Sequence, residues 1–184
     1  MKNLLFIVGS QRENSFNGRL AKEAARLLEG RASVRTLSYA DVPLMNQDIE
    51  LPAPGPVARV RAEVIGADGV WIFSPEYNGS YPGGLKNLLD WLSRPLVSDG
   101  SSRDTAFAGK KVAVSSVAGR SAGAGVRSKL VELLTKMRVD VMEDPQAGIA
   151  LPAESFATDA FELTDEQRKQ LENQIRAFLA YLDA

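Results

Sequence analysis

The stretch from Val70 to Arg94, VWIFSPEYNGSYPGGLKNLLDWLSR, constrains this chain more than any other. Its apolar start, 70–74, predicts a buried strand, and its end predicts a helix with leucines at 85, 88, 89 and 92 on one face. Between them, prolines and glycines exclude regular structure. Such a loop presents bare main-chain groups, and loops at the carboxyl ends of strands are where α/β proteins bind ligands.

The rest of the chain alternates short apolar runs with helical patterns. Besides 70–74, we expect strands at 4–8, 34–37, 111–116 and 139–142, and helices at 17–30, 57–66, 84–93, 126–137 and 165–182. Thr164 has the spacing of a capping box before the last helix. The alternation predicts one α/β domain over 1–184, a three-layer sandwich with a five-stranded parallel sheet and helices on both faces. At this length we expect the flavodoxin-like strand order 2-1-3-4-5.

That order brings the loops after the first and third strands together. The first loop, 9–17, supplies the side chains of Ser10, Arg12, Ser15 and Asn17 next to a helix start, a combination that suits a phosphate monoester. It matches neither GxGxxG nor GxxxxGK[ST], which argues against a Rossmann-type dinucleotide site and against a nucleotide triphosphatase. The alternative is that Ser15 or Asn17 only caps the helix and that Arg12 is a solvated charge.

The other two strand-end loops also allow two readings. The third-strand loop, PEYNGSYPGG, could be a surface turn with Tyr77 and Tyr81 packed on the neighbouring helix. The fourth-strand loop, SVAGRSAGAG, is rich in small residues, so it could admit the edge of a flat ligand or serve as a flexible linker.

Composition narrows the chemistry. The chain has no cysteine and no histidine, which removes thiolate nucleophiles, disulfides, the commonest general base and the commonest metal ligands, and we expect no metal site. A net charge of −1 does not provide the positive charge that binding to nucleic acid or to an anionic membrane requires, so neither is expected as a partner. The apolar run 4–8 is too short for a signal peptide or a membrane span, so a cytoplasmic location is expected. A cofactor is therefore the natural chemical agent.

Two motifs carry a specific resemblance. GSxRxxSxN after the first strand and PEYNxSxPGxLKNxxDWxSR after the third resemble the NADPH-dependent FMN reductase family, flavodoxin-like flavoproteins that include quinone, chromate and azo-dye reductases. The resemblance implies three groups of FMN-binding residues. They are Ser10, Arg12, Ser15, Phe16 and Asn17 for the phosphate; Pro75, Glu76, Tyr77, Asn78 and Gly79 for the isoalloxazine; and Ser116 and Gly119 for the ribityl chain or pyrimidine end.

The implied activity is that of an FMN-dependent NAD(P)H oxidoreductase. It would reduce quinones or related electrophiles by ping-pong hydride transfer through bound FMN, with chromate and azo compounds as side acceptors, NADPH or NADH as donor, and no catalytic side chain. The variable segment 41–50 leaves the acceptor open.

Three alternatives share the fold. One is an FMN reductase that supplies free reduced flavin. Another is an electron-carrier flavodoxin, but carriers usually bear a strongly acidic surface, which 22 basic against 23 acidic residues do not supply. The last is a non-enzymatic regulatory module. A receiver domain would need an acidic residue at a strand end, where this chain has Phe73-Ser74-Pro75.

Trp91 lies off the leucine stripe of its helix. With Tyr81, Asp90 and Arg94 it predicts an exposed aromatic and charged cluster at a subunit contact. The alternative is that Trp91 fills a gap under the connection 95–109. The family resemblance implies a homodimer or homotetramer.

Overall fold

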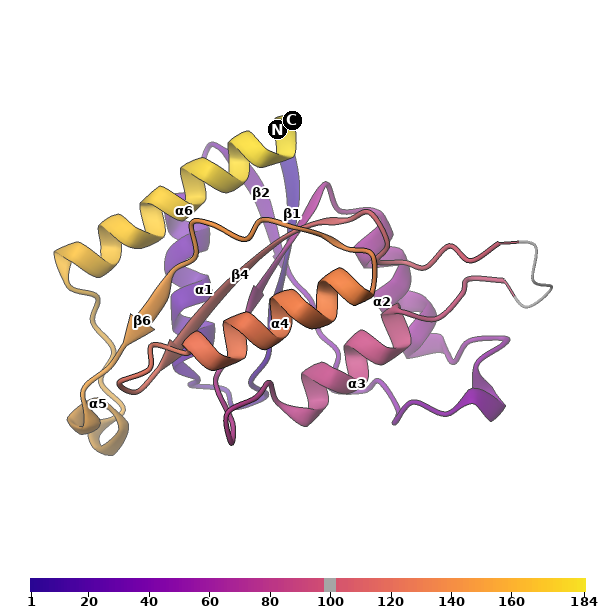
Figure 1. The fold of residues 1–184 in the computed structure, drawn as a ribbon, viewed down its shortest axis with the longest axis horizontal. Coiled ribbons are helices and arrows are strands. Elements are labelled where there is room, and N and C mark those ends of the chain that lie inside the picture. The colour runs from indigo at the N-terminus through magenta and orange to yellow at the C-terminus, as the bar shows by residue number, and fades with distance from the viewer. Residues whose placement is uncertain (98–101) are drawn as a thin grey trace.

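A parallel sheet forms the centre of the computed structural model, which describes residues 1–97 and 102–184. Its strands follow the order β2-β1-β3-β4-β5, as predicted. Figure 1 shows the sheet, with β1, β2, β4 and β6 labelled. The bounds are β1 (Lys2–Val8), β2 (Ala32–Thr36), β3 (Gly69–Phe73), β4 (Lys111–Ala118), β5 (Asp140–Val141) and β6 (Gly148–Ala150). Every pairing is parallel, so the carboxyl ends of the strands share one edge.

β6 and a short helix after it were not predicted. β5 pairs with Lys111 and Val112 at the start of β4, whereas β6 pairs with 116–118 at its end. Two short strands in succession thus flank the same side of β4. Two residues after β6, the six-residue helix α5 (Ala153–Thr158) begins, where an irregular connection was expected. Elements this short show too little periodicity to be recognised in the sequence.

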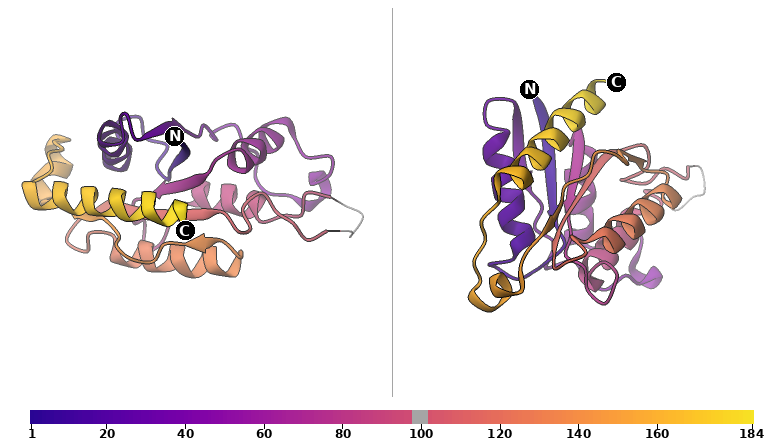
Figure 2. Two further views of the ribbon diagram at one scale, coloured as in Figure 1. Left: turned by 90° about the horizontal axis from the view of Figure 1, so that it is seen from above. Right: turned by 60° about the vertical axis from the view of Figure 1, so that its left-hand side comes forward.

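Helices cover both faces of the sheet. They are α1 (Phe16–Leu27), α2 (Gly55–Ile65), α3 (Gly83–Leu92), α4 (Ala124–Lys136) and α6 (Asp165–Asp183), with a 3-10 turn at Gln47–Ile49. α1 and α6 pack on one face against side chains such as Phe6 and Trp71, and α2, α3 and α4 pack on the other against Leu5 and Ile72 (Figure 2). Alternate residues of each strand point to opposite faces, so two separate cores form.

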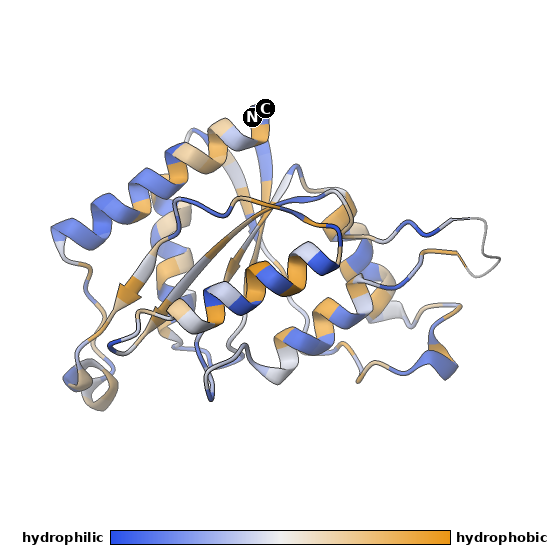
Figure 3. Cartoon of the chain, viewed as in Figure 1, coloured by the Kyte–Doolittle hydropathy of each residue, from blue (hydrophilic) through white to orange (hydrophobic). Residues whose placement is uncertain are grey.

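The outer helices are amphipathic. Figure 3 shows hydrophobic and hydrophilic residues alternating along α4. The last helix begins with the predicted capping box, because the Thr164 hydroxyl accepts from the Gln167 N–H while the Gln167 side chain accepts from the Thr164 N–H. Within the described residues, no helix has the length and apolar character that crossing a bilayer requires.

The prediction that Trp91 is exposed was wrong. Its side chain is 0% exposed, and its indole Nε1 donates a hydrogen bond of 2.8 Å to the Pro43 carbonyl. A buried indole needs such a partner. Trp91 is therefore a buried residue whose indole is tied to the connection between β2 and α2.

Two further polar residues, one on α3 and one just after it, hold the same connection. The Asn87 amide accepts from the Met45 N–H at 2.7 Å and donates to the Pro43 carbonyl at 2.8 Å. Seven residues after Asn87, Arg94 forms a two-pronged pair with Glu50 at 2.8 and 3.0 Å. Asn87 and Trp91 lie one turn apart on α3, and Arg94 follows two residues beyond its end; together they anchor the segment 43–50.

Candidate functional site

A cavity of about 270 Å³ lies at the carboxyl edge of the sheet, where β1, β3 and β4 end. Its lining includes all five residues expected at the phosphate site in the first loop. It also includes Pro75, Glu76 and Tyr77 of the third-strand loop and Gly119 of the fourth. In full, the lining consists of Ser10, Arg12, Ser15, Phe16, Asn17, Pro75, Glu76, Tyr77, Val117, Ala118, Gly119 and Phe156. Asn78, Gly79 and Ser116, also expected at the site, do not line this cavity.

In the first loop, two side chains already have structural partners. The Ser15 hydroxyl accepts from the Gly18 N–H at 2.9 Å and caps α1, as the alternative reading proposed. The Asn17 amide donates to the Val117 carbonyl at 3.0 Å and accepts from the Val117 N–H at 2.8 Å. Asn17 therefore clasps the first loop to the end of β4. What these residues still offer a ligand is the Ser15 hydroxyl proton and the main-chain N–H groups of a helix start.

Arg12 is held at the rim of the cavity. Its Nη2 lies 2.9 Å from Oδ1 of Asp159, and its guanidinium lies 5.4 Å from the centre of the Phe16 ring. Arg19 contacts the other carboxylate oxygen of Asp159 at 2.8 Å. The hydrogen bond from Arg12, together with both positive charges, lowers the pKa of Asp159 below its ordinary value. Asp159 was not a predicted site residue, and no sequence motif marks it.

In the third loop, Glu76 faces a helix rather than open space. Its Oε2 accepts from the Val126 N–H in the first turn of α4 at 3.1 Å, a favourable place for a carboxylate. A Cβ at Gly125 would lie 3.1 Å from the same oxygen, so glycine there makes room for Glu76. The Glu76 side chain thus fixes the third loop on the first turn of α4.

The remaining residues of this loop form a tight turn. Tyr77 and Ser80 exchange main-chain hydrogen bonds of 2.8 and 3.0 Å, with Asn78 and Gly79 between them in the left-handed region at φ 52° and 70°. Tyr77 is 50% exposed, and its hydroxyl lies 3.5 Å from the Ser10 hydroxyl across the cavity. Tyr77 is therefore a side wall of the site and does not pack on the neighbouring helix as a core residue.

In the fourth loop, Ser116 is fully buried. Its hydroxyl donates to the Ser74 carbonyl at 2.6 Å, and Gly123 lies so close that a Cβ there would overlap the hydroxyl. Its side chain thus joins the ends of β3 and β4. Gly119 does border the cavity, and a Cβ built on it would meet nothing within 4 Å.

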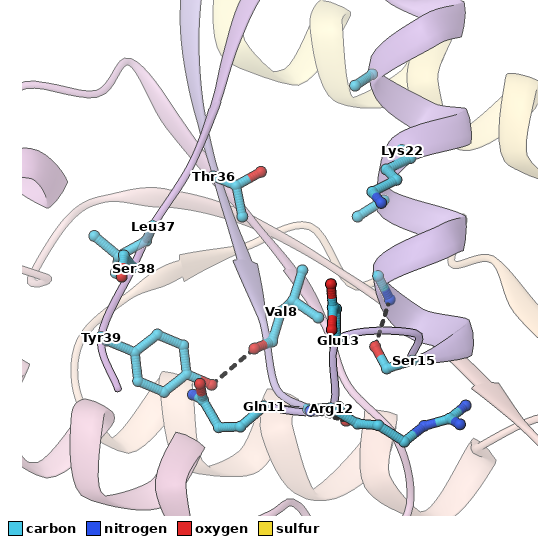
Figure 4. A pocket seen from close by; sticks show the side chains of 14 residues that line it. Val8, Gln11, Arg12, Glu13, Ser15, Lys22, Thr36, Leu37, Ser38 and Tyr39 are labelled. Carbon is cyan, nitrogen blue, oxygen red and sulfur yellow. Dashed lines mark hydrogen bonds between the residues drawn. The ribbon is translucent and has the colours of Figure 1, made fainter. Parts of the chain in front are cut away.

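A second hollow, of about 330 Å³, lies on the other side of the first loop between α1 and the end of β2 (Figure 4). The Tyr39 hydroxyl there donates to the Val8 carbonyl at 2.7 Å, and burial raises the pKa of Tyr39 to about 12. In Figure 4 the Arg12 guanidinium points away from Tyr39 and Thr36. Of these two cavities in the described part of the chain, the first is bordered by the loops after β1, β3 and β4, and it is the candidate site.

Known proteins match this chain over most of its length. The model of the NADPH-dependent FMN reductase family matches residues 2–154. A quinone reductase of Pseudomonas putida KT2440 is 34% identical over 178 residues, which cover 96% of this chain and 92% of that protein. An NAD(P)H-dependent FMN reductase of Pseudomonas aeruginosa PAO1 is 31% identical, covering 95% and 91%.

A solved structure shows the same likeness. The flavoenzyme NAD(P)H:(acceptor) oxidoreductase FerB from Paracoccus denitrificans superposes with a TM-score of 0.86 at 32% identity, covering 100% of this chain and 98% of that one.

The clasp made by Asn17 yields a stability prediction. Asn17→Ala should lower the free energy of unfolding by about 2 to 4 kcal/mol, because it leaves both main-chain groups of Val117 without their buried partner. Urea denaturation measures the loss. Asn14→Ala, in the exposed part of the same loop, is the control and should change stability by less than about 0.5 kcal/mol. Equal effects of the two substitutions would contradict the clasp.

Proposed function

Because the chain belongs to the NADPH-dependent FMN reductase family, we propose that its cavity binds FMN and that the enzyme reduces quinones or related flat electrophiles. The protein is an oxidoreductase that uses FMN with NAD(P)H as electron donor. One observation supports the assignment of the site: the loops after β1, β3 and β4 meet around one cavity, which is lined by a cation, a helix start and residues of the third and fourth loops.

The phosphate end of FMN fits the first loop. Ser10 and Ser15 offer hydroxyl groups and Arg12 offers a guanidinium. The first turn of α1, whose residues Phe16 and Asn17 line the cavity, offers main-chain N–H groups. Phe16 lines the site beneath Arg12. In this proposal Asn17 contributes its main chain, since its side chain is engaged with Val117.

The isoalloxazine end fits the third and fourth loops. The ring would lie against the main chain of 75–79, whose Glu76 side chain is turned toward α4. Glycines at 79, 83, 84 and 119 leave open space where side chains would otherwise stand. Ser116 would support the site indirectly: its hydroxyl joins the ends of β3 and β4, and it would make no direct contact with the ribityl chain.

Bound FMN supplies the redox chemistry, by accepting a hydride from the nicotinamide and passing reducing equivalents to the acceptor. The protein supplies binding, orientation and an open approach. That division of labour suits a chain without histidine or cysteine. Quinones are proposed as acceptors because the Pseudomonas putida relative is named a quinone reductase. Chromate and azo compounds are proposed as side acceptors, NADPH and NADH both remain donors in this proposal, and the location is proposed to be cytoplasmic.

We also propose a homodimer or homotetramer, on a different surface from the one first expected. Trp91 is buried and cannot contribute a contact. The connection that it anchors instead exposes Leu44, Ile49 and Leu51, at 83%, 43% and 37%. Exposed apolar side chains on one connection support a protein contact there.

The phosphate assignment predicts a selective loss of affinity. Arg12→Ala should weaken FMN binding about tenfold to a hundredfold, because a charge-assisted hydrogen bond is lost, while riboflavin binding changes little. Flavin fluorescence quenching measures both affinities. Arg31→Ala, at an exposed arginine beyond α1, is the control and should leave both unchanged. Equal losses for FMN and riboflavin would remove Arg12 from the phosphate site.

The proposed activity predicts ping-pong kinetics. If donor and acceptor use one flavin site in turn, steady-state plots of NAD(P)H against a quinone should give parallel lines, and anaerobic NAD(P)H alone should bleach the bound flavin. Intersecting lines, with activity that depends on free FMN as a substrate, would favour the second candidate, an FMN reductase that releases reduced flavin.

The assembly proposal predicts at least a dimer at micromolar concentration in light scattering. Leu44→Ser combined with Ile49→Ser should shift the protein toward monomer, since both apolar side chains are exposed. Ile65→Ser, at an exposed residue of α2, is the control. A wild-type monomer would refute the proposal.

A further inference from the structure

The segment after β6 places a charged residue, Asp159, in contact with Arg12 of the proposed phosphate site. The match to the family model ends at residue 154, so Phe156 and Asp159 both lie beyond it. Phe156 nevertheless lines the cavity, and its ring packs edge-on against Phe16 at 5.2 Å. Asp159 follows α5 directly and adopts a left-handed backbone conformation with φ of 58°.

Asp159 is fixed from one side by Arg19. The Arg19 guanidinium donates to the Asp159 carbonyl through Nη1 and to its Oδ2 through Nη2 at 2.8 Å. Arg19 comes from the second turn of α1 and does not line the cavity. The carboxylate is therefore held in one orientation before Arg12 is considered, and its Oδ1 is directed to Arg12.

Arg12 uses only part of its guanidinium on this carboxylate. Nη2 contacts Oδ1 at 2.9 Å, while a guanidinium has five N–H donors. The Arg12 and Arg19 guanidiniums lie 5.4 and 5.5 Å from the centre of the Phe16 ring. Arg12 is thus supported by an aromatic ring and by one ionic contact, with donors left for a ligand.

From this geometry we infer that Asp159 is a positioning residue of the flavin site, which holds Arg12 ready for the FMN phosphate. The inference rests on the proposed function. Without Asp159, the long side chain of Arg12 would have to be ordered by the phosphate alone, and the lost side-chain entropy would reduce affinity.

Charge and position distinguish this role from competition with the phosphate. Two arginines and one aspartate leave a net positive charge of one for the incoming dianion. Asp159 does not line the cavity, so its carboxylate stands behind Arg12 and not in the place of the ligand. An aspartate is ionised at neutral pH, and the hydrogen bond from Arg12 with both arginine charges lowers the pKa of Asp159 further.

The test compares FMN with riboflavin, which lacks the phosphate. Asp159→Asn keeps the shape of the side chain and removes its charge. We expect FMN affinity of the apoprotein to fall about fivefold to twentyfold, with riboflavin affinity within about twofold of wild type. Arg19→Ala should act in the same direction, although Arg19 does not line the cavity. Glu162→Gln, an exposed acid of the same connection, is the control and should change neither affinity.

A double-variant cycle shows whether Asp159 acts through Arg12. In the Arg12→Ala background, Asp159→Asn should cause no further loss of FMN affinity. Asp159→Glu, which keeps the charge but moves it by one methylene, should give a smaller FMN-selective loss and serves if Asp159→Asn does not fold.

Three results would overturn the inference. Tighter FMN binding by Asp159→Asn would show that Asp159 competes with the phosphate for Arg12. Equal losses of FMN and riboflavin affinity would show a general structural role. Additive losses in the Arg12→Ala, Asp159→Asn double variant would show that Asp159 does not act through Arg12. A wild-type protein that binds no FMN would instead refute the proposed function itself.

Discussion

The carboxyl edge of the parallel sheet sets the main constraint on this structure. Buried main-chain groups there have no further strand to pair with, yet each needs a hydrogen-bond partner. The chain meets this need by tying the strand-end loops to one another: the Gly9 N–H donates to the Phe73 carbonyl, the Ser74 N–H donates to the Ser115 carbonyl, and Asn17 clasps Val117. Three loops from distant parts of the sequence are thereby fixed around one cavity.

Local periodicity was sufficient to predict the main helices and strands, their alternation with the chain length predicted the strand order, and residue spacing predicted the capping box at Thr164. It could not predict features that depend on distant partners. β6 exists because the end of β4 offers it a free edge, and Trp91 is buried because a carbonyl 48 residues away accepts its N–H. Neither partner leaves a periodic signal near the residue concerned.

The site loops were predicted from their composition, but the roles of several side chains were not. Glu76 and Asn17 have polar groups that suit ligands, and in the structure these groups bind main-chain atoms of neighbouring elements. Type and spacing do not show which of two polar partners a side chain takes. Asp159 was missed because an isolated aspartate in an irregular stretch resembles any surface charge.

In the segment 43–50, the groups that attach it to the protein are different from the side chains that it exposes. α3 holds the main-chain groups of this segment, the Pro43 carbonyl and the Met45 N–H, and Arg94 just after the helix holds one side chain, Glu50. The side chains of Leu44 and Ile49 take no part in that attachment and face outward. The segment can therefore change its outer residues while its path stays the same, so the enzyme could acquire a new neighbouring surface, for a substrate or for another subunit, without redesign of the fold beneath it.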